Sequence, residues 1–116
     1  MGIIKEMRKV IIFGTGLYGK QALQFFTREN VMFWTDNNED LHRKLIEGIE
    51  VIPPSELKKY LNECVIVIAA KPEFFNQIKY QLNKEYGIEM ALNYTFLKSY
   101  INDSGISVGE FLSGCM

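Results

Sequence analysis

The sequence predicts an α/β domain, a parallel sheet with helices packed on both of its faces. Three short apolar runs, at 10–13, 31–34 and 64–70, lack the alternation of a half-exposed strand, which is typical of strands covered on both sides. Between the runs, apolar residues recur at helical spacing. Strands that alternate with helices are joined by right-handed crossovers. We therefore expect a three-layer, doubly wound parallel sheet of about five strands in a single domain.

Length and composition narrow the classes of function. The chain has 116 residues, 47% of them hydrophobic and 23% charged, with a formal net charge of −1, which is typical of one folded globular domain. Because acidic and basic residues nearly cancel, we expect no nucleic acid partner. No apolar run is long enough to span a membrane, so we expect no membrane insertion and a cytoplasmic location. Two cysteines and one histidine are too few for a structural zinc site.

The first strand, helix and second strand follow one another closely. The apolar run Val10–Phe13 ends at Gly14, and from Leu17 the period changes to that of a helix whose apolar face includes Phe26. The run at 31–34 predicts the second strand, and polar, turn-prone residues follow it. This part of the chain therefore predicts a strand, a glycine turn, a helix and a second strand.

The middle of the chain is less regular. Residues 41–50 allow one or two helical turns that Gly48 stops, and 50–52 predict a short strand before Pro53-Pro54. A proline in the first turn then opens a helix that runs through Leu61, because its missing N–H costs nothing there.

The second half carries the strongest strand and the longest helix. The run 64–70 is dense in β-branched residues and does not alternate with polar ones, which predicts a strand in the middle of the sheet. Helical spacing predicts a helix over Pro72–Glu85, and 88–92 predict a final strand. The chain then divides into a sheet domain over 8–92 and, over 93–116, a C-terminal helix with a loose tail or the stub of a longer chain.

A glycine-rich turn lies directly after the first strand and opens the first helix. The missing side chain at Gly14 would allow a tight turn out of the strand, and at Gly16 it would let a pyrophosphate approach the backbone closely. At Gly19 it would let the helix pack closely on the strands. The N–H groups at the start of the helix then point at the phosphates, and the helix dipole favours their negative charge. This G-x-G-x-x-G pattern in strand–turn–helix context predicts a Rossmann-like nucleotide-binding domain.

An acidic residue stands where such a domain binds the adenosine ribose. Asp36 follows Gly14 by 22 residues at the end of the second strand, and its carboxylate favours NAD over NADP because it repels a 2′-phosphate. The loop after the fourth strand, with Ala70 and the cation Lys71, is expected in the same crevice. The predicted cofactor-binding residues are Gly14, Thr15, Gly16, Leu17, Tyr18, Gly19, Asp36, Asn37, Ala70 and Lys71.

Other patterns in the chain have simpler explanations. The pairs Tyr80/Lys84 and Tyr94/Lys98 match the Tyr-x-x-x-Lys spacing of short-chain dehydrogenases, but surface helix pairs explain them better. Asp36, Asn38 and Asp40 have the spacing of calcium-loop ligands, but Leu41 stands where such a loop requires glycine. We expect Cys64 to be a buried small side chain, and we expect no catalytic residue and no metal site.

The order of four segments resembles a known group of proteins. They are VIIFGTGLYGKQAL after Lys9, FWTDNN at 33–38, GIEVIPPSEL at 48–57 and CVIVIAA at 64–70. Together they are similar to small bacterial Rossmann domains that accompany nucleotide-sugar epimerase/dehydratases, sugar acyltransferases and some methyl- and glycosyltransferases. The resemblance implies a nucleotide or nucleotide sugar at the glycine loop and Asp36.

The expected function is that of a nucleotide-binding module, for NAD or a nucleotide-diphosphate sugar, in bacterial sugar or surface-polysaccharide biosynthesis. The isolated chain is expected to bind its nucleotide ligand without catalysing a reaction. It is expected to be a module of a nucleotide-sugar-modifying enzyme. The alternative is a structural or regulatory module with a vestigial site that acts through protein–protein contacts. The protein partner is left open: it is either a second copy of this chain, in a homo-oligomer, or a companion enzyme domain.

Overall fold

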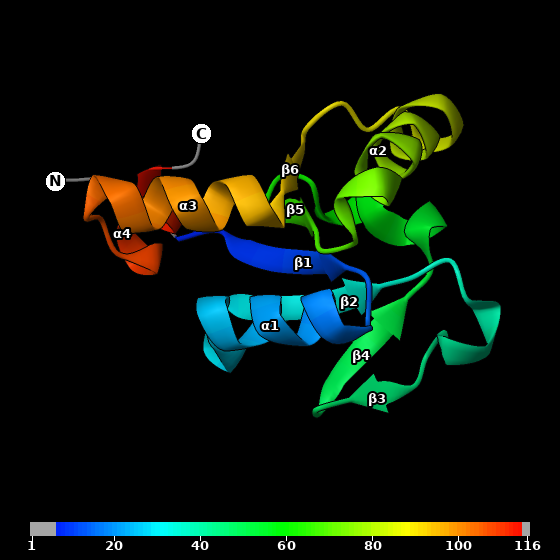
Figure 1. Ribbon diagram of the computed structural model, residues 1–116. Coiled ribbons are helices and arrows are strands. Elements are labelled where there is room, and N and C mark those ends of the chain that lie inside the picture. The colour runs from blue at the N-terminus through cyan, green and yellow to red at the C-terminus, as the bar shows by residue number, and fades with distance from the viewer. Residues whose placement is uncertain (1–6, 115–116) are drawn as a thin grey trace, which may run out of the picture.

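The computed structural model describes residues 7–114 and confirms the predicted α/β architecture (Figure 1). Within these residues six strands form one sheet in the order β3-β4-β2-β1-β5-β6. Neighbouring strands are parallel except β3 and β4, which are antiparallel. The strands are β1 (Lys9–Phe13), β2 (Val31–Thr35), β3 (Leu45–Ile46), β4 (Ile49–Ile52), β5 (Cys64–Ile68) and β6 (Ala91–Asn93).

Helices cover both faces of the sheet and make the two outer layers. The α-helices are α1 (Leu17–Phe26), α2 (Pro72–Tyr86), α3 (Tyr94–Ser104) and α4 (Val108–Gly114). The short 3-10 helices are η1 (Arg28–Asn30), η2 (Glu39–Leu41) and η3 (Pro54–Tyr60). One core cluster joins the sheet to α1, α3 and α4, and a second joins it to η3 and α2.

The central strands are those that the apolar runs predict. Every residue of β5 is buried, and β1 pairs with β5 on one side and with β2 on the other. From β1 the chain passes through α1 to β2, on one side of β1. From β5, on the other side of β1, it passes through α2 to β6, farther from β1. The point where the direction of winding reverses lies between β1 and β5, and ligands of open α/β sheets bind at such a point.

The segment 41–50 differs from its prediction. It folds into η2 and an antiparallel β3–β4 hairpin instead of a helix. Both turn residues, Glu47 and Gly48, have positive φ, of 54° and 78°, as a two-residue hairpin turn requires. Trp34 Nε1 donates to the Ile46 carbonyl at 2.9 Å and so ties the hairpin to the core.

The C-terminal segment also differs from the loose tail that was expected. The described part of it forms α3 and α4, and both helices bury apolar side chains in the cluster that α1 shares. Asn93 caps α3, because its side-chain oxygen accepts from the Thr95 N–H at 2.9 Å. The boundary between 92 and 93 stays a prediction, and Cys115 lies outside the described residues.

Candidate functional site

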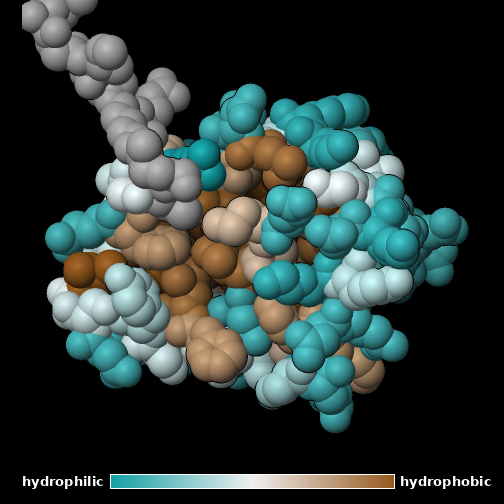
Figure 2. All heavy atoms as spheres, turned by 90° about the horizontal axis from the view of Figure 1, so that it is seen from above, coloured by the Kyte–Doolittle hydropathy of each residue, from teal (hydrophilic) through white to brown (hydrophobic). Residues whose placement is uncertain are grey.

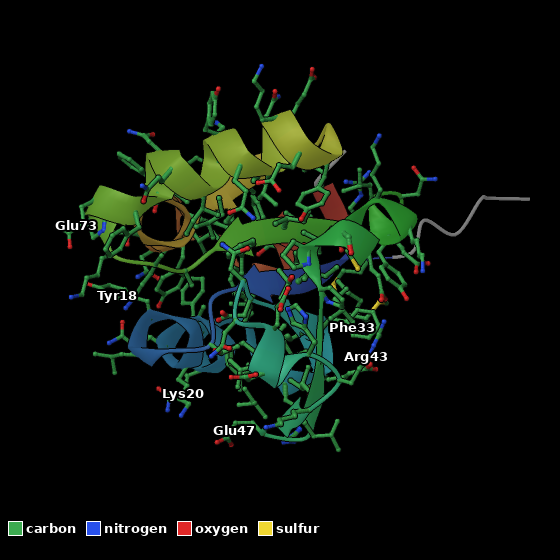
Figure 3. The ribbon with its side chains drawn as sticks, turned by 90° about the vertical axis from the view of Figure 1, so that its right-hand side faces the viewer. Tyr18, Lys20, Phe33, Arg43, Glu47 and Glu73 are labelled. Atoms are coloured by element: carbon green, nitrogen blue, oxygen red, sulfur yellow. The ribbon has the colours of Figure 1, made fainter. Side chains whose placement is uncertain are left out.

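The candidate site lies at the carboxyl ends of β1, β2 and β5, where the glycine loop connects β1 to α1. Gly14 donates its N–H to the Thr35 carbonyl at 2.9 Å, which fixes the loop against the end of β2. Figure 3 looks onto this edge and shows Tyr18 and Glu73, from the starts of α1 and α2, on the same side of the molecule, whereas Lys20 points away. The starts of two helices therefore border one region.

Two of the three loop glycines are required by packing. Gly14 has a φ of +115°, and a Cβ there would lie 2.5 Å from the Ala69 carbonyl oxygen. A Cβ on Gly19 would lie 2.0 Å from the Gly14 carbonyl oxygen and 3.2 Å from the Trp34 ring. Any side chain at these positions would overlap the neighbouring strand ends, so both glycines serve the fold itself.

Gly16 has no such explanation. A Cβ there would meet nothing within 4 Å, and its φ of −82° is open to any residue. Gly16 is the N-cap of α1, and no side chain of the described residues caps the helix. The first N–H groups of α1 are therefore free of capping side chains and can donate to an anion.

Asp36 is turned toward the glycine loop. Its Oδ2 accepts from the Thr15 N–H at 3.1 Å and from the Thr15 hydroxyl at 2.9 Å, while its Oδ1 accepts from the Asn38 N–H at 2.9 Å. The carboxylate thus holds the glycine loop and the start of the next loop together. His42 is half-buried, and its Nε2 lies 2.7 Å from the Asp36 carbonyl oxygen.

Asn37 joins the same rim to α2. Its Nδ2 donates to Gln81 Oε1 at 2.9 Å, and Gln81 Nε2 donates back to Asn37 Oδ1 at 2.7 Å. The loop after β2 is therefore bonded on one side to the glycine loop and on the other to α2. Such bonds hold the rim in one arrangement before any ligand arrives.

These residues surround a cleft of about 400 Å³, a volume within the usual range of small-molecule sites. Nine of the ten predicted site residues line it, and Gly19 alone is packed beneath. Sequence reasoning missed four lining residues: Phe13 and Ala69 at the strand ends, and Phe74 and Ile78, which are four residues apart on α2. The complete lining is Phe13, Gly14, Thr15, Gly16, Leu17, Tyr18, Asp36, Asn37, Ala69, Ala70, Lys71, Phe74 and Ile78.

Lys71 is the cation of this lining and the N-cap of α2, and Pro72 occupies the first turn of that helix. No side chain of the described residues caps α2. A positive side chain and the positive end of a helix dipole therefore stand on the β5 side of the cleft, opposite the start of α1.

A second hollow, of about 340 Å³, lies at the other end of the strands beside β6. Figure 2, seen from above the view of Figure 1, shows apolar side chains gathered between polar rims on that face of the molecule. Cys64 lines this hollow, and burial, reinforced by the charge of Glu63, raises the pKa of its thiol to about 12. A thiol that stays protonated is a poor nucleophile, so Cys64 is a buried apolar side chain.

The two Tyr-x-x-x-Lys pairs lie outside the cleft. Tyr80 is 65% exposed on α2, whereas Tyr94 is 3% exposed, in the core, with Lys98 Nζ 6.0 Å from its ring centre. Residues 7–114 contain no group of three or more His, Cys, Asp or Glu side chains that could hold a metal ion. The same residues include no helix that is both long enough and apolar enough to cross a membrane.

Three solved structures share the fold. UDP-D-quinovosamine 4-dehydrogenase from Vibrio fischeri matches with a TM-score of 0.58 and 18% identity, covering 90% of each chain. The Rex-family repressor RSP matches with a TM-score of 0.56 and 16% identity over 85% of this chain and 58% of its own. RSP in complex with β-NAD⁺ and operator DNA gives 0.55 and 16% over 84% and 55%. No curated protein matches the sequence.

The expectation that nucleic acid is no partner is wrong, because a protein of this fold is solved on operator DNA. That expectation rested on the net charge of the whole chain, and a nearly neutral protein can still carry local groups that bind phosphates.

A family model described as C2185-like, N-terminal, matches residues 6–91, and the chain belongs to this family.

Proposed function

We propose that this member of the C2185-like N-terminal family binds a nucleotide, NAD or a nucleotide-diphosphate sugar, in the cleft above the glycine loop. Gly16 is the observation that carries the proposal. Packing accounts for Gly14 and Gly19, but nothing within 4 Å explains the missing side chain at Gly16. A pyrophosphate that approaches the backbone there would explain it, since a side chain would occupy the same space.

The residues around Gly16 fit such a ligand. The uncapped start of α1 would hold the phosphates, and Lys71 and the start of α2 would add positive charge from the other side. Asp36 would reach the ribose hydroxyls with the acceptor sites that Thr15 and Asn38 leave open, because a carboxylate has about four. The same negative charge disfavours a 2′-phosphate, which favours NAD over NADP.

We place this binding in bacterial sugar or surface-polysaccharide biosynthesis, supported by the similarity of the segments at 33–38 and 48–57 to domains that accompany nucleotide-sugar enzymes. The likeness of the fold to a UDP-sugar dehydrogenase supports the same class of ligand. The lining holds no histidine or cysteine and a single carboxylate, that of Asp36. Tyr18 and Lys71 are the other titratable side chains of the lining, and we propose ligand binding as the function of the cleft.

Titration of the purified chain with NAD⁺, NADH and UDP-sugars by calorimetry tests the proposal. Gly16→Val should weaken ligand binding at least tenfold while lowering the free energy of unfolding by less than about 1 kcal/mol, because its side chain enters open space. Gln24→Val, on an exposed position of the same helix, is the matched control and should bind like the wild type. Absence of heat and of a thermal shift with millimolar ligand would contradict the proposal.

One observation favours the alternative of a structural or regulatory module. The Asp36 carboxylate holds the glycine loop to the loop after β2 through its bonds to Thr15 and Asn38, and this structural role needs no ligand. If the site is vestigial, Gly16→Val should leave the function of the protein in the cell unchanged. If the site binds a ligand, the same substitution should abolish that function.

A further inference from the structure

We propose that the outer edge of β6, together with the aromatic pair Phe96 and Tyr100 on α3, is the surface through which two copies of this chain form a dimer. A two-fold axis relates the two copies, and their β6 strands pair antiparallel. This inference goes beyond nucleotide binding and does not depend on it, because the two aromatic residues lie outside the lining of the cleft.

β6 is an edge strand without the charged residues that commonly protect such an edge. β5 pairs with one side of β6, and no strand within residues 7–114 pairs with its other side. Residues 90–97, which include β6, contain no charged residue and no proline. β3, at the opposite edge of the sheet, lies directly between Lys44 and Glu47. Because charged side chains discourage pairing between edges, β6 is the edge that is open to another strand.

Large apolar and aromatic side chains are exposed beside this edge. Phe96 is 77% exposed, Tyr100 58%, and Met90, which directly precedes β6, 70%. β6 is the uppermost strand in Figure 1, so Figure 2 looks down on this edge and shows apolar side chains gathered there. Aromatic side chains bury about 150–250 Å² each, so Phe96 and Tyr100 alone would supply about a third of the roughly 800 Å² per partner that a specific interface needs.

The charge of this surface fits a second copy of the same chain. In a two-fold dimer one patch meets itself, so any charge at its centre faces the same charge of the other copy. The one charged residue between Phe96 and Tyr100 is Lys98, and its Nζ lies 6.0 Å from the centre of the Tyr94 ring, which is in the core. Lys98 therefore lies on the other side of α3, and two copies bring no like charges together at the centre of the contact.

The positions of the two aromatic residues match an antiparallel pairing of the β6 strands. α3 begins directly after β6 and runs back along the sheet, antiparallel to the strands (Figure 1). Residues advance about 3.3 Å in a strand and about 1.5 Å in a helix, so a pairing centred on Leu92 brings Phe96 of one copy level with Tyr100 of the other to within about 2 Å. Phe96 and Tyr100 are four residues apart and lie on the same side of α3. Each dimer therefore gains two Phe–Tyr contacts.

Sedimentation equilibrium of the full chain, from about 1 µM to about 1 mM, tests the proposal, and the wild type should form a dimer in this range. Phe96→Ala should raise the dissociation constant of the dimer about a hundredfold, because losing a central aromatic residue costs about tenfold and the change occurs in both copies. Leu45→Ala is the matched control, since Leu45 is 69% exposed on β3, and it should leave the constant unchanged. Thermal unfolding of both variants at low concentration verifies that the monomer stays folded.

A pair of complementary variants tests the two-fold arrangement. Phe96→Lys and Tyr100→Glu should each abolish the dimer, whereas an equimolar mixture of the two should form a heterodimer. In the mixture the new lysine of one copy faces the new glutamate of the other, and the second contact keeps its original aromatic pair.

Four results would overturn the proposal. They are a wild type that stays monomeric at about 1 mM, a dissociation constant unchanged by Phe96→Ala, an equal loss with Leu45→Ala, and a mixture of the complementary variants that stays monomeric. The first of these results would leave the β6 edge to a different protein.

Discussion

Single residues in the glycine loop show how one sequence motif combines two kinds of constraint. Gly14 and Gly19 are glycines because backbone oxygens lie 2.5 Å and 2.0 Å from the Cβ each would carry. Gly16 is a glycine with free space around it. The motif alone predicted all three positions, but only the contacts separate the two glycines that packing requires from the one, Gly16, that packing leaves unexplained.

Replacement of Gly19 by alanine tests this division. In an open helix the change would stabilise the protein by about 1 kcal/mol, because alanine has the higher helix propensity. At Gly19 we expect the opposite, a loss of about 3 kcal/mol, since the added Cβ overlaps the Gly14 carbonyl. Urea unfolding of Gly19→Ala beside Gly16→Ala measures both effects. A Gly19→Ala protein as stable as the wild type would show that the loop can move away from β2.

The roles of side chains in the site were less predictable than their positions. The distance of Asp36 from Gly14 along the chain placed it correctly at the rim of the cleft. Its bonds to Thr15 and the pairing of Asn37 with Gln81 join residues 21 and 44 positions apart. No periodicity encodes such bonds, because they depend on how separate elements meet. Phe74 was missed for the same reason, since α2 must be docked before its cleft side can be identified.

The β3–β4 hairpin shows how turn chemistry overrides a helical pattern at the scale of an element. Leu41, Leu45 and Ile46 are spaced like one side of a helix, yet Gly48 at a φ of 78° and Glu47 at 54° reverse the chain between two strands. Helical spacing over so few residues is weak, whereas a two-residue turn with positive φ needs a specific backbone. The long, strongly patterned elements β1, β5 and α2 were predicted correctly because burial and periodicity agree there.

The turn itself can be improved. A two-residue turn with positive φ at both positions favours Asn-Gly, and glutamate is an unfavourable first residue. Glu47→Asn should therefore raise the free energy of unfolding by about 0.5 kcal/mol, as other relieved positive-φ positions do. Thermal unfolding at a fixed pH measures the change. Glu39→Asn, an exposed glutamate in η2 with a different backbone, should give no comparable gain, and equal gains would indicate a charge effect instead.

Across the whole molecule, two core clusters on opposite faces of the sheet are completed by elements distant in the sequence. Tyr94, Leu97, Ile101 and Leu112, from α3 and α4, are buried in the cluster that contains Phe26 of α1. The sequence predicted the sheet and its covering layers but not this closure, because short helices with mixed composition gain their stability from the surface they cover.

Deletion of residues 93–116 tests how far the sheet domain depends on that closure. The four buried side chains are each worth about 1.5–3 kcal/mol, a sum comparable with the whole stability of a domain of this size. The truncated chain should therefore lose cooperative unfolding, as followed by circular dichroism against urea. A two-state transition in the truncated chain would instead support 8–92 as an independent unit.

The junction between β6 and α3 has a consequence for chemistry. The strand ends at Asn93 and the helix begins at Tyr94, with no intervening residue. In folds of this class, segments that emerge from strand tips arch over bound molecules and shut out bulk water. Within residues 7–114 no loop separates β6 from α3, so the part of a long ligand that extended past β5 would stay in contact with solvent there.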